Sequence, residues 1–159
     1  MKLKSSKGFT LIEMLIVITI IAILTAITIP TFSHYNNNRN LKEAAQEISG
    51  DIQLYKQRAI AENTRYRIVF SVGGNNYSVQ KETFYYSHVW VDVVVNKAVS
   101  PDNNQITLIG ADSTVPFSNR GITTSGANVT QVIQHSKLLS QATIITSTMG
   151  KVSVTYVLN

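Results

Sequence analysis

A long apolar run near the amino terminus constrains the fold of this 159-residue chain more than any other feature. From Phe9 to Ile29, twenty-one consecutive residues contain a single ionisable group, Glu13. As a helix this run would be ~31 Å long, about the thickness of the hydrocarbon core of a bilayer. A secretory signal has a shorter apolar region followed by a small-x-small cleavage site, and no Ala-x-Ala occurs near Ile29. The run therefore predicts one membrane-spanning helix.

Three lysines precede this run and fix its expected orientation. Lys2, Lys4 and Lys7 should stay in the cytoplasm by the positive-inside rule, which places everything after Pro30 on the far side of the membrane. Without the first eight residues, 11 basic residues face 9 acidic ones, and the formal charge falls from +5 to +2. The high calculated pI of about 9.5 is thus weak support for a nucleic-acid-binding surface.

Glu13 is unusual inside such a run. A carboxylate near the centre of a span costs at least ~2.5 kcal/mol, so a residue kept there usually has a partner. The alternative is that Glu13, about one turn from the membrane edge, snorkels to the interface or stays protonated.

The residues from Lys7 to Leu15, KGFTLIEML, resemble the class III prepilin signal of type IV pilins and type II secretion pseudopilins. The shared features are a short basic leader, Gly8, the aromatic Phe9, Glu13 as the fifth mature residue, and a continuous apolar helix. This resemblance implies that a membrane prepilin peptidase cuts after Gly8 and methylates the new amine of Phe9. It also implies a filament in which Glu13 of one subunit neutralises the Phe9 amine of its neighbour, built by an inner-membrane assembly platform. Pro30 lies where the family commonly has a proline.

The next segment predicts a helix with one buried face. Pro30 lacks an amide donor and predicts a kink, and the polar, Asn-rich residues 34–40 predict a frayed or extended piece. Beyond it, apolar residues recur every three or four positions: Leu41, Ala45, Ile48, Ile52, Tyr55 and Ala59. This spacing predicts an amphipathic helix that ends near Asn63.

After Asn63 the pattern changes to short β-like runs, which predict an α+β head of antiparallel sheets on the helix. Strands are expected at residues 65–72, 77–80, 85–95, 105–109, 142–147 and 151–158. Gly73-Gly74-Asn75-Asn76 predicts a hairpin turn, as does Thr148-Met149-Gly150, and residues 101–104 and 121–128 read as loops. The expected organisation is a leader at 1–8, a transmembrane and assembly helix at 9–29, a linker and amphipathic helix at 30–62, and a β-rich head at 63–159.

The head is similar to the GspH/FimT family of minor pseudopilins and minor pilins. The similarity lies in the helix from Ala44 to Ile60, in Phe117-Ser118-Asn119-Arg120-Gly121, and in the closing hairpin from Thr146 to Val152. It implies a type IV pilin-like fold and a structural subunit near the tip of a secretion pseudopilus or a type IV pilus. The repeating major pilin is a further alternative, which the lack of a carboxy-terminal disulfide disfavours.

Catalytic and metal-binding functions find little support. The absence of Cys removes thiolate chemistry and disulfides. His34, His88 and His135 lack the spacing of metal ligands, and acidic residues are too sparse after Asp92 for a calcium site. We therefore expect no enzyme activity, no metal and no cofactor.

A DNA-capturing minor pilin of an uptake pilus is the main alternative. Arg58, Arg65 and Arg67, with the aromatic Tyr66 between the last two, would contact phosphates, and Lys151 lies where DNA-binding members carry a Gly-Arg-x-Arg element. The alternative is that these arginines lie on a solvated hairpin edge, where their charges prevent unwanted strand pairing. Trp90 and Tyr85-Tyr86 are expected on the inward face of a strand.

Overall fold

The chain forms one long helix and eight strands in the computed structural model, which describes the backbone of residues 8–84, 87–100 and 105–159 and, within these, all side chains except those of residues 27–34. The chain divides into two compact units, residues 1–36 and 37–159. The second unit is called the head below. The elements are α1 (Leu11–Ala61), β1 (Tyr66–Ser71), β2 (Asn76–Glu82), β3 (Trp90–Ala98), β4 (Ile106–Ile109), β5 (Ser113–Phe117), β6 (Val129–His135), β7 (Gln141–Thr146) and β8 (Val152–Val157).

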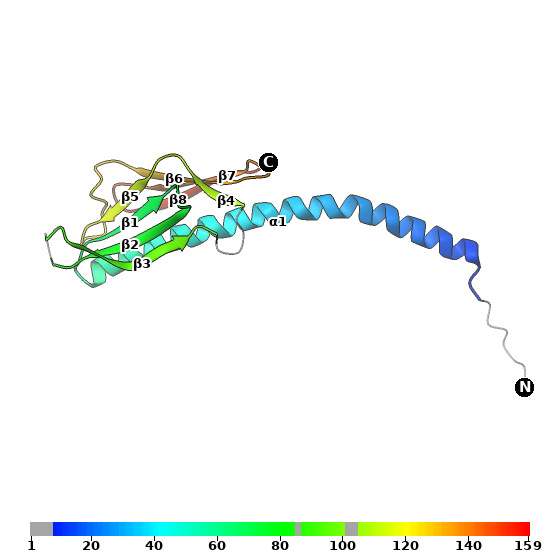
Figure 1. The fold of residues 1–159 in the computed structure, drawn as a ribbon, viewed down its shortest axis with the longest axis horizontal. Helices are drawn as coiled ribbons and strands as arrows, with labels where there is room; N and C mark the ends of the chain where they lie inside the picture. The colour runs from blue at the N-terminus through cyan, green and yellow to red at the C-terminus, as the bar shows by residue number, and fades with distance from the viewer. Residues whose placement is uncertain (1–7, 85–86, 101–104) are drawn as a thin grey trace, which may run out of the picture. The chain divides into compact units, whose positions relative to one another are not determined.

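Two antiparallel sheets make up the head together with the carboxy-terminal part of α1 (Figure 1). One sheet has the order β3-β2-β1-β5 and the other the order β4-β6-β7-β8. The predicted hairpins are present: β1 and β2 are joined by a turn at residues 72–75, and β7 and β8 enclose Thr148-Met149-Gly150. The loop predicted at 101–104 and the aromatic pair Tyr85-Tyr86 lie outside the described residues.

One hydrophobic core joins the helix to both sheets. All six residues expected on the buried face of the helix are buried, and Ile52 is 0% exposed. They pack against inward side chains of the strands, among them Tyr66, Ile68, Phe70 and Ile144. Fully burying such an aliphatic or aromatic side chain stabilises the folded state by roughly 1.5–3 kcal/mol. All core residues among the described side chains lie within the head, so residues 37–159 contain what this unit needs to fold.

Three expectations about secondary structure were wrong. The backbone is helical through the Asn-rich residues 34–40, where a frayed or extended piece was predicted. β5 and β6 were not predicted, because Pro116 interrupts the first and polar residues occupy the inward positions of the second. β3 begins at Trp90 rather than at residue 85. α1 also continues through Pro30, whose side chain is outside the description, so the kink remains a prediction.

Candidate functional site

The first turn of α1 positions Glu13. The helix begins at Leu11, and the Glu13 amide donates to the Thr10 hydroxyl oxygen at 3.2 Å. Thr10 is therefore the N-cap and Glu13 the third helical residue, the Thr-x-x-Glu pattern of a capping box. The carboxylate therefore lies at the amino-terminal end of the helix, where the helix dipole is positive. Sequence analysis overlooked this cap, although the spacing of Thr10 and Glu13 was the signal for it.

The surroundings of Gly8, Phe9 and Glu13 are open. Phe9 is 78% exposed, and a β-carbon added to Gly8 would meet no atom within 4 Å. Apolar side chains from Leu11 to Leu24 are likewise exposed. Glu13 forms no ion pair with any described residue of its own chain. Among the described residues, no helix combines the length and apolar character needed to cross a membrane.

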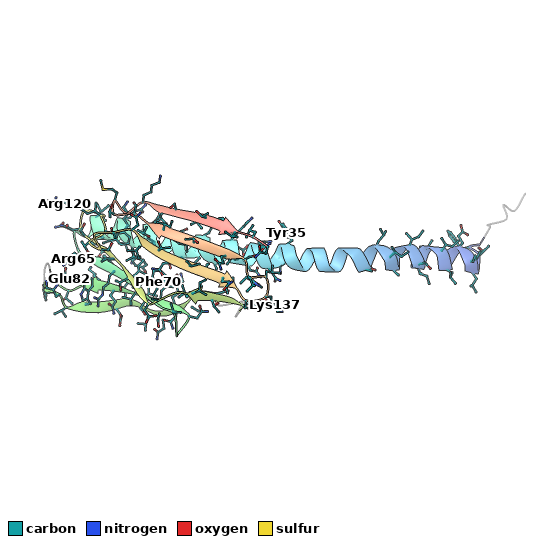
Figure 2. The ribbon with its side chains drawn as sticks, turned by 90° about the horizontal axis from the view of Figure 1, so that it is seen from above. Tyr35, Arg65, Phe70, Glu82, Arg120 and Lys137 are labelled. Atoms are coloured by element: carbon teal, nitrogen blue, oxygen red, sulfur yellow. The ribbon has the colours of Figure 1, made fainter. Side chains whose placement is uncertain are left out.

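Arg65 lies on the outward face of the first sheet and is paired within it. β1, β2 and β3 align Arg65, Glu82 and Trp90 in one row, since Glu82 pairs with Trp90 and its amide donates to the Arg65 carbonyl oxygen. The Glu82 side chain is fully buried and lies 3.6 Å from the Arg65 guanidinium (Figure 2). The Glu82 carboxylate also accepts a hydrogen bond from the His88 amide. Arg65 therefore serves the sheet as a counter-ion.

Arg67 lies in the next row and is occupied by neutral partners. Its Nε donates to Gln80 Oε1 at 2.6 Å, and its guanidinium lies over the Trp90 ring, 4.2 Å from the centroid. Burial lowers the pKa of Arg67 from its ordinary value, and the charge of Asp92 opposes this shift. The inward position expected for Trp90 was wrong: the ring is half-buried on the outer face, because Arg67 covers it there.

Tyr66 does not accompany the two arginines as an exposed aromatic. It lies on the inward face, 2% exposed, and its hydroxyl donates to Glu62 at 2.8 Å. Burial, and then the bond to Glu62, raise the pKa of Tyr66 to about 12. Arg58 is an exposed residue of the last turn of α1 and lies over the Tyr55 ring. The structure thus does not assemble Arg58, Arg65, Arg67 and Tyr66 into one nucleic-acid surface.

Lys151 lies in a different place, beside α1. Gln53, Lys56 and Gln57 of the helix and Gly150, Lys151 and Val152 of the closing hairpin line a pocket of about 420 Å³. Lys56 Nζ donates to the carbonyl oxygen of Gly150 at 2.9 Å. Sequence analysis did not find Lys56, because only the packing of two segments 94 residues apart brings it to Lys151.

The two histidines whose side chains are described, His88 and His135, do not form a common site. His135 is fully buried and accepts hydrogen bonds at Nδ1 from the amides of Lys137 and Leu138, whereas His88 is exposed. The side chain of His34 lies outside the described residues. Within the described part of the chain, no group of three or more His, Asp or Glu residues could hold a metal ion.

Comparison with known proteins relates the chain to pilins and their relatives. The family described as the Prokaryotic N-terminal methylation motif matches residues 3–29. Competence protein ComGD of Bacillus subtilis is 36% identical over 69 residues, 43% of this chain and 48% of ComGD. A fimbrial protein of Pseudomonas aeruginosa is 47% identical over 47 residues, 30% of each chain. Type II secretion system protein H of Pseudomonas aeruginosa PAO1 is 30% identical over 64 residues, 40% of this chain and 37% of that protein.

The chain therefore spans about half, or less, of the length of these curated relatives. The fold has a fuller counterpart in the crystal structure of the type IV minor pilin FimU of Pseudomonas aeruginosa. That likeness has a TM-score of 0.58 at 15% identity, over 76% of this chain and 92% of FimU. The predicted resemblance to type IV pilin-like prepilins is confirmed, and so is the predicted α+β fold of a long helix on antiparallel sheets.

Proposed function

We propose that this type IV pilin-like prepilin is a minor pilin or pseudopilin of the GspH/FimT type. It is cleaved after Gly8, methylated on Phe9 and incorporated near the tip of a secretion pseudopilus or a type IV pilus. The observation that carries the proposal is a methylation motif at residues 3–29 on a chain whose head has the fold of a minor pilin. Its work is structural rather than enzymatic.

The apolar segment from Phe9 to Ile29 serves the subunit twice. Before assembly it holds the prepilin in the inner membrane, with the lysines of the leader in the cytoplasm and the head in the periplasm. During assembly its exposed apolar side chains exchange lipid contacts for contacts with similar helices of other subunits. The same stretch is therefore both the anchor and the main filament contact.

Cleavage after Gly8 creates a positive charge on the Phe9 amine, and Glu13 is the residue that pairs with this charge. The new amine of Phe9 is a cation beside an apolar helix, and in the low dielectric of a filament core an unpaired ion is costly. Glu13 of an adjacent subunit supplies the counter-ion, so the pair sets the register between subunits more than it adds net stability. The cap from Thr10 holds the first turn of the helix in the form that presents this carboxylate.

Processing is tested by replacing Gly8 with Leu. Because the space around Gly8 is open, a side chain there does not disturb the chain itself, and any effect falls on the peptidase. The variant should accumulate as a precursor heavier by the eight-residue leader. An unchanged mature mass would refute processing at this position.

The charge pair is tested by replacing Glu13 with Val, with Ile12→Val as the matched control. Glu13→Val should insert into the membrane and be processed, but it should enter filaments poorly, while the control assembles normally. Thr10→Ala removes the cap and keeps the charge, which separates a defect in helix capping from a defect in pairing. Normal incorporation of Glu13→Val would contradict the charge-pair mechanism.

A DNA-capturing pilin remains the competing proposal, and the name of the competence protein ComGD motivates a test of it. Arg65 and Arg67 already hold Glu82, Gln80 and Trp90, which leaves them poorly disposed to track phosphates. If the head bound DNA, affinity would fall steeply with rising salt. No binding of a labelled oligonucleotide at low salt would remove this function.

A further inference from the structure

The pocket between α1 and the β7–β8 hairpin is lined by hydrogen-bond donors. The helix contributes Gln53, Lys56 and Gln57, which lie on one face at relative positions 0, 3 and 4. The hairpin contributes Gly150, Lys151 and Val152 from the opposite side. Two ammonium groups and two carboxamides therefore line the pocket, and none of its lining residues is acidic.

The Lys56 ammonium is held in a fixed position at this pocket. Nζ donates to the carbonyl oxygen of Gly150 at 2.9 Å and lies 3.4 Å from that of Met149. An ammonium has three donors, so these two bonds leave one for a ligand. Carbonyl oxygens supply no negative charge, and none of the ion pairs among the described residues includes this half-buried cation.

Two glycines allow the close approach of the loops beside Lys56. Gly121 and Gly150 both have positive φ, 74° and 69°, which favours glycine. A β-carbon on Gly150 would clash with the Gly121 carbonyl oxygen and would lie 3.0 Å from Lys56 Cε. The close approach of these two loops thus depends on the missing side chains, and it leaves room for the lysine between them.

The acidic residues of the head are engaged elsewhere. Within the described residues, the ion pairs use Glu43 with Arg39, Glu62 with Lys81, Glu82 with Arg65, and both Glu47 and Asp51 with Lys97. No carboxylate of the described chain lies within 4.0 Å of Lys56 or Lys151. The charge of the pocket is therefore left for another molecule to balance.

Exposed apolar side chains near the pocket favour a protein as that molecule. Met149 is 74% exposed beside Gly150, and Ile122, next to Gly121, is 42% exposed. Ile60 is 49% exposed and lies against Gly121. Exposed apolar side chains beside a cationic pocket suit an aliphatic surface carrying one acidic side chain. A nucleic-acid strand would need a longer track of cations, spaced to follow its phosphates.

We propose that this pocket binds the carboxylate of an Asp or Glu side chain from a neighbouring pilin-type subunit. This inference rests on the proposed function, because it requires assembly with other subunits. Lys56 is the positioned donor, Lys151 adds the second charge at the mouth, and Gln53 and Gln57 donate from the helix. The contact would join heads, whereas the pair of Phe9 and Glu13 joins helices, so the two are separable.

Zero-length carbodiimide coupling of assembled filaments tests the contact directly, since it joins an amine to a carboxylate in contact with it. Mapping of the coupled peptides should place Lys56 or Lys151 on an acidic residue of a different pilin subunit. The matched control is Lys137, an exposed lysine that should couple at background level. It lies at the other end of the head from Arg120, the residue that precedes Gly121 beside the pocket (Figure 2). The lack of Cys in the chain excludes competing thiol adducts.

Variants then establish which groups carry the contact. The double variant Lys56→Gln and Lys151→Gln should still be cleaved and incorporated through its helix, but retention of the neighbouring subunit in sheared filaments should fall about tenfold. Lys137→Gln should change nothing. Replacing the mapped acidic residue with Lys, together with Lys151→Glu, should restore retention.

Three outcomes would overturn the proposal. One is coupling of Lys56 and Lys151 no stronger than that of Lys137, and another is coupling only to carboxylates of the same chain. The third is binding of a labelled oligonucleotide that the double variant abolishes while subunit retention stays normal, which would assign the pocket to DNA. Complete absence of the chain from filaments would instead refute the proposed function.

Discussion

A lysine at the end of β3 ties that strand to the helix, and its removal has a calculable effect. Lys97 Nζ lies 2.7 Å from Asp51 Oδ2 and 2.8 Å from Glu47 Oε1. The Tyr77 hydroxyl donates to the same Asp51 oxygen at 2.6 Å. Burial first, and then the bond to Asp51, raise the pKa of Tyr77, so its hydroxyl stays protonated and keeps donating.

The substitution Lys97→Met keeps the aliphatic stem and removes the charge. The side chains of Lys97 and Asp51 are 32% and 19% exposed, so their charged hydrogen bond is worth about 1.5 kcal/mol, at the low end for such bonds. Glu47 is 43% exposed, and solvent screening reduces its contribution to roughly 0.5 kcal/mol. The expected loss is about 2 kcal/mol of unfolding free energy, or about 8 °C in Tm for a domain of this size.

Urea denaturation of residues 37–159, which contain the whole core, measures this loss. A double-mutant cycle of Lys97→Met and Asp51→Asn should give a coupling energy of about 1 kcal/mol or more. Lys137→Met, at an exposed lysine, is the control and should unfold like the wild type. A Lys97→Met head with the wild-type urea midpoint, or a coupling energy near zero, would show that the Lys97–Asp51 pair does not stabilise the head.

Two further predictions concern Ser140 and His135, two buried polar residues of the head. Ser140 is fully buried, and its hydroxyl donates to Asn38 and accepts from the Asn159 amide. Ser140→Ala should therefore lower the free energy of unfolding by about 1–2 kcal/mol and speed hydrogen exchange of the amides in β8. Unchanged exchange would contradict this. Burial, and then the charge of Lys137, lower the pKa of His135 below 6.5, so only the unfolded chain gains a proton as pH falls below about 6.5. The urea midpoint of the wild type should therefore fall from pH 7.5 to pH 5.5. The fall should be smaller in His135→Leu and undiminished in the control His88→Asn. An equal change of midpoint with pH in the wild type and both variants would count against a buried neutral imidazole.

The helix and the hairpins could be predicted because their signals are local. Apolar spacing in α1 identified the six core positions from Leu41 to Ala59, and Gly-rich turns marked the two hairpins that the structure contains. The Asn-rich piece is helical despite weak propensity. Each Asn costs well under 1 kcal/mol relative to Ala, and contacts such as those of Asn38 with Ser140 and Asn159 offset this cost.

The two strands that were not predicted, β5 and β6, depend on tertiary contacts that a local sequence pattern does not show. β5 tolerates Pro116 because it is the edge of its sheet, where a missing amide need not break a ladder. β6 places Gln131 and His135 at buried positions, and this removes the apolar alternation that would reveal a strand. The side chain of Gln131 is satisfied by Ser113 across the two sheets, a contact that no window of sequence contains.

The two candidate sites also differ in whether local sequence is enough to predict them. Gly8, Phe9 and Glu13 lie within six residues, so a short sequence motif is enough to propose them as a site. The pocket at Lys56 depends on the packing of the closing hairpin against the helix, with Gly121 between them. Of the residues that line this pocket, only Lys151 was predicted as a site residue, and it was predicted to bind DNA.

The proposed function depends on trimming of the precursor, which creates a modified amino terminus at Phe9. Intact-mass and peptide mass spectrometry of the native protein, isolated from sheared filaments, tests it most directly. We expect an amino-terminal peptide that begins at Phe9 and carries one methyl group on its amine. A chain that still begins at Met1, or one found only in membranes and never in a filament, would contradict it.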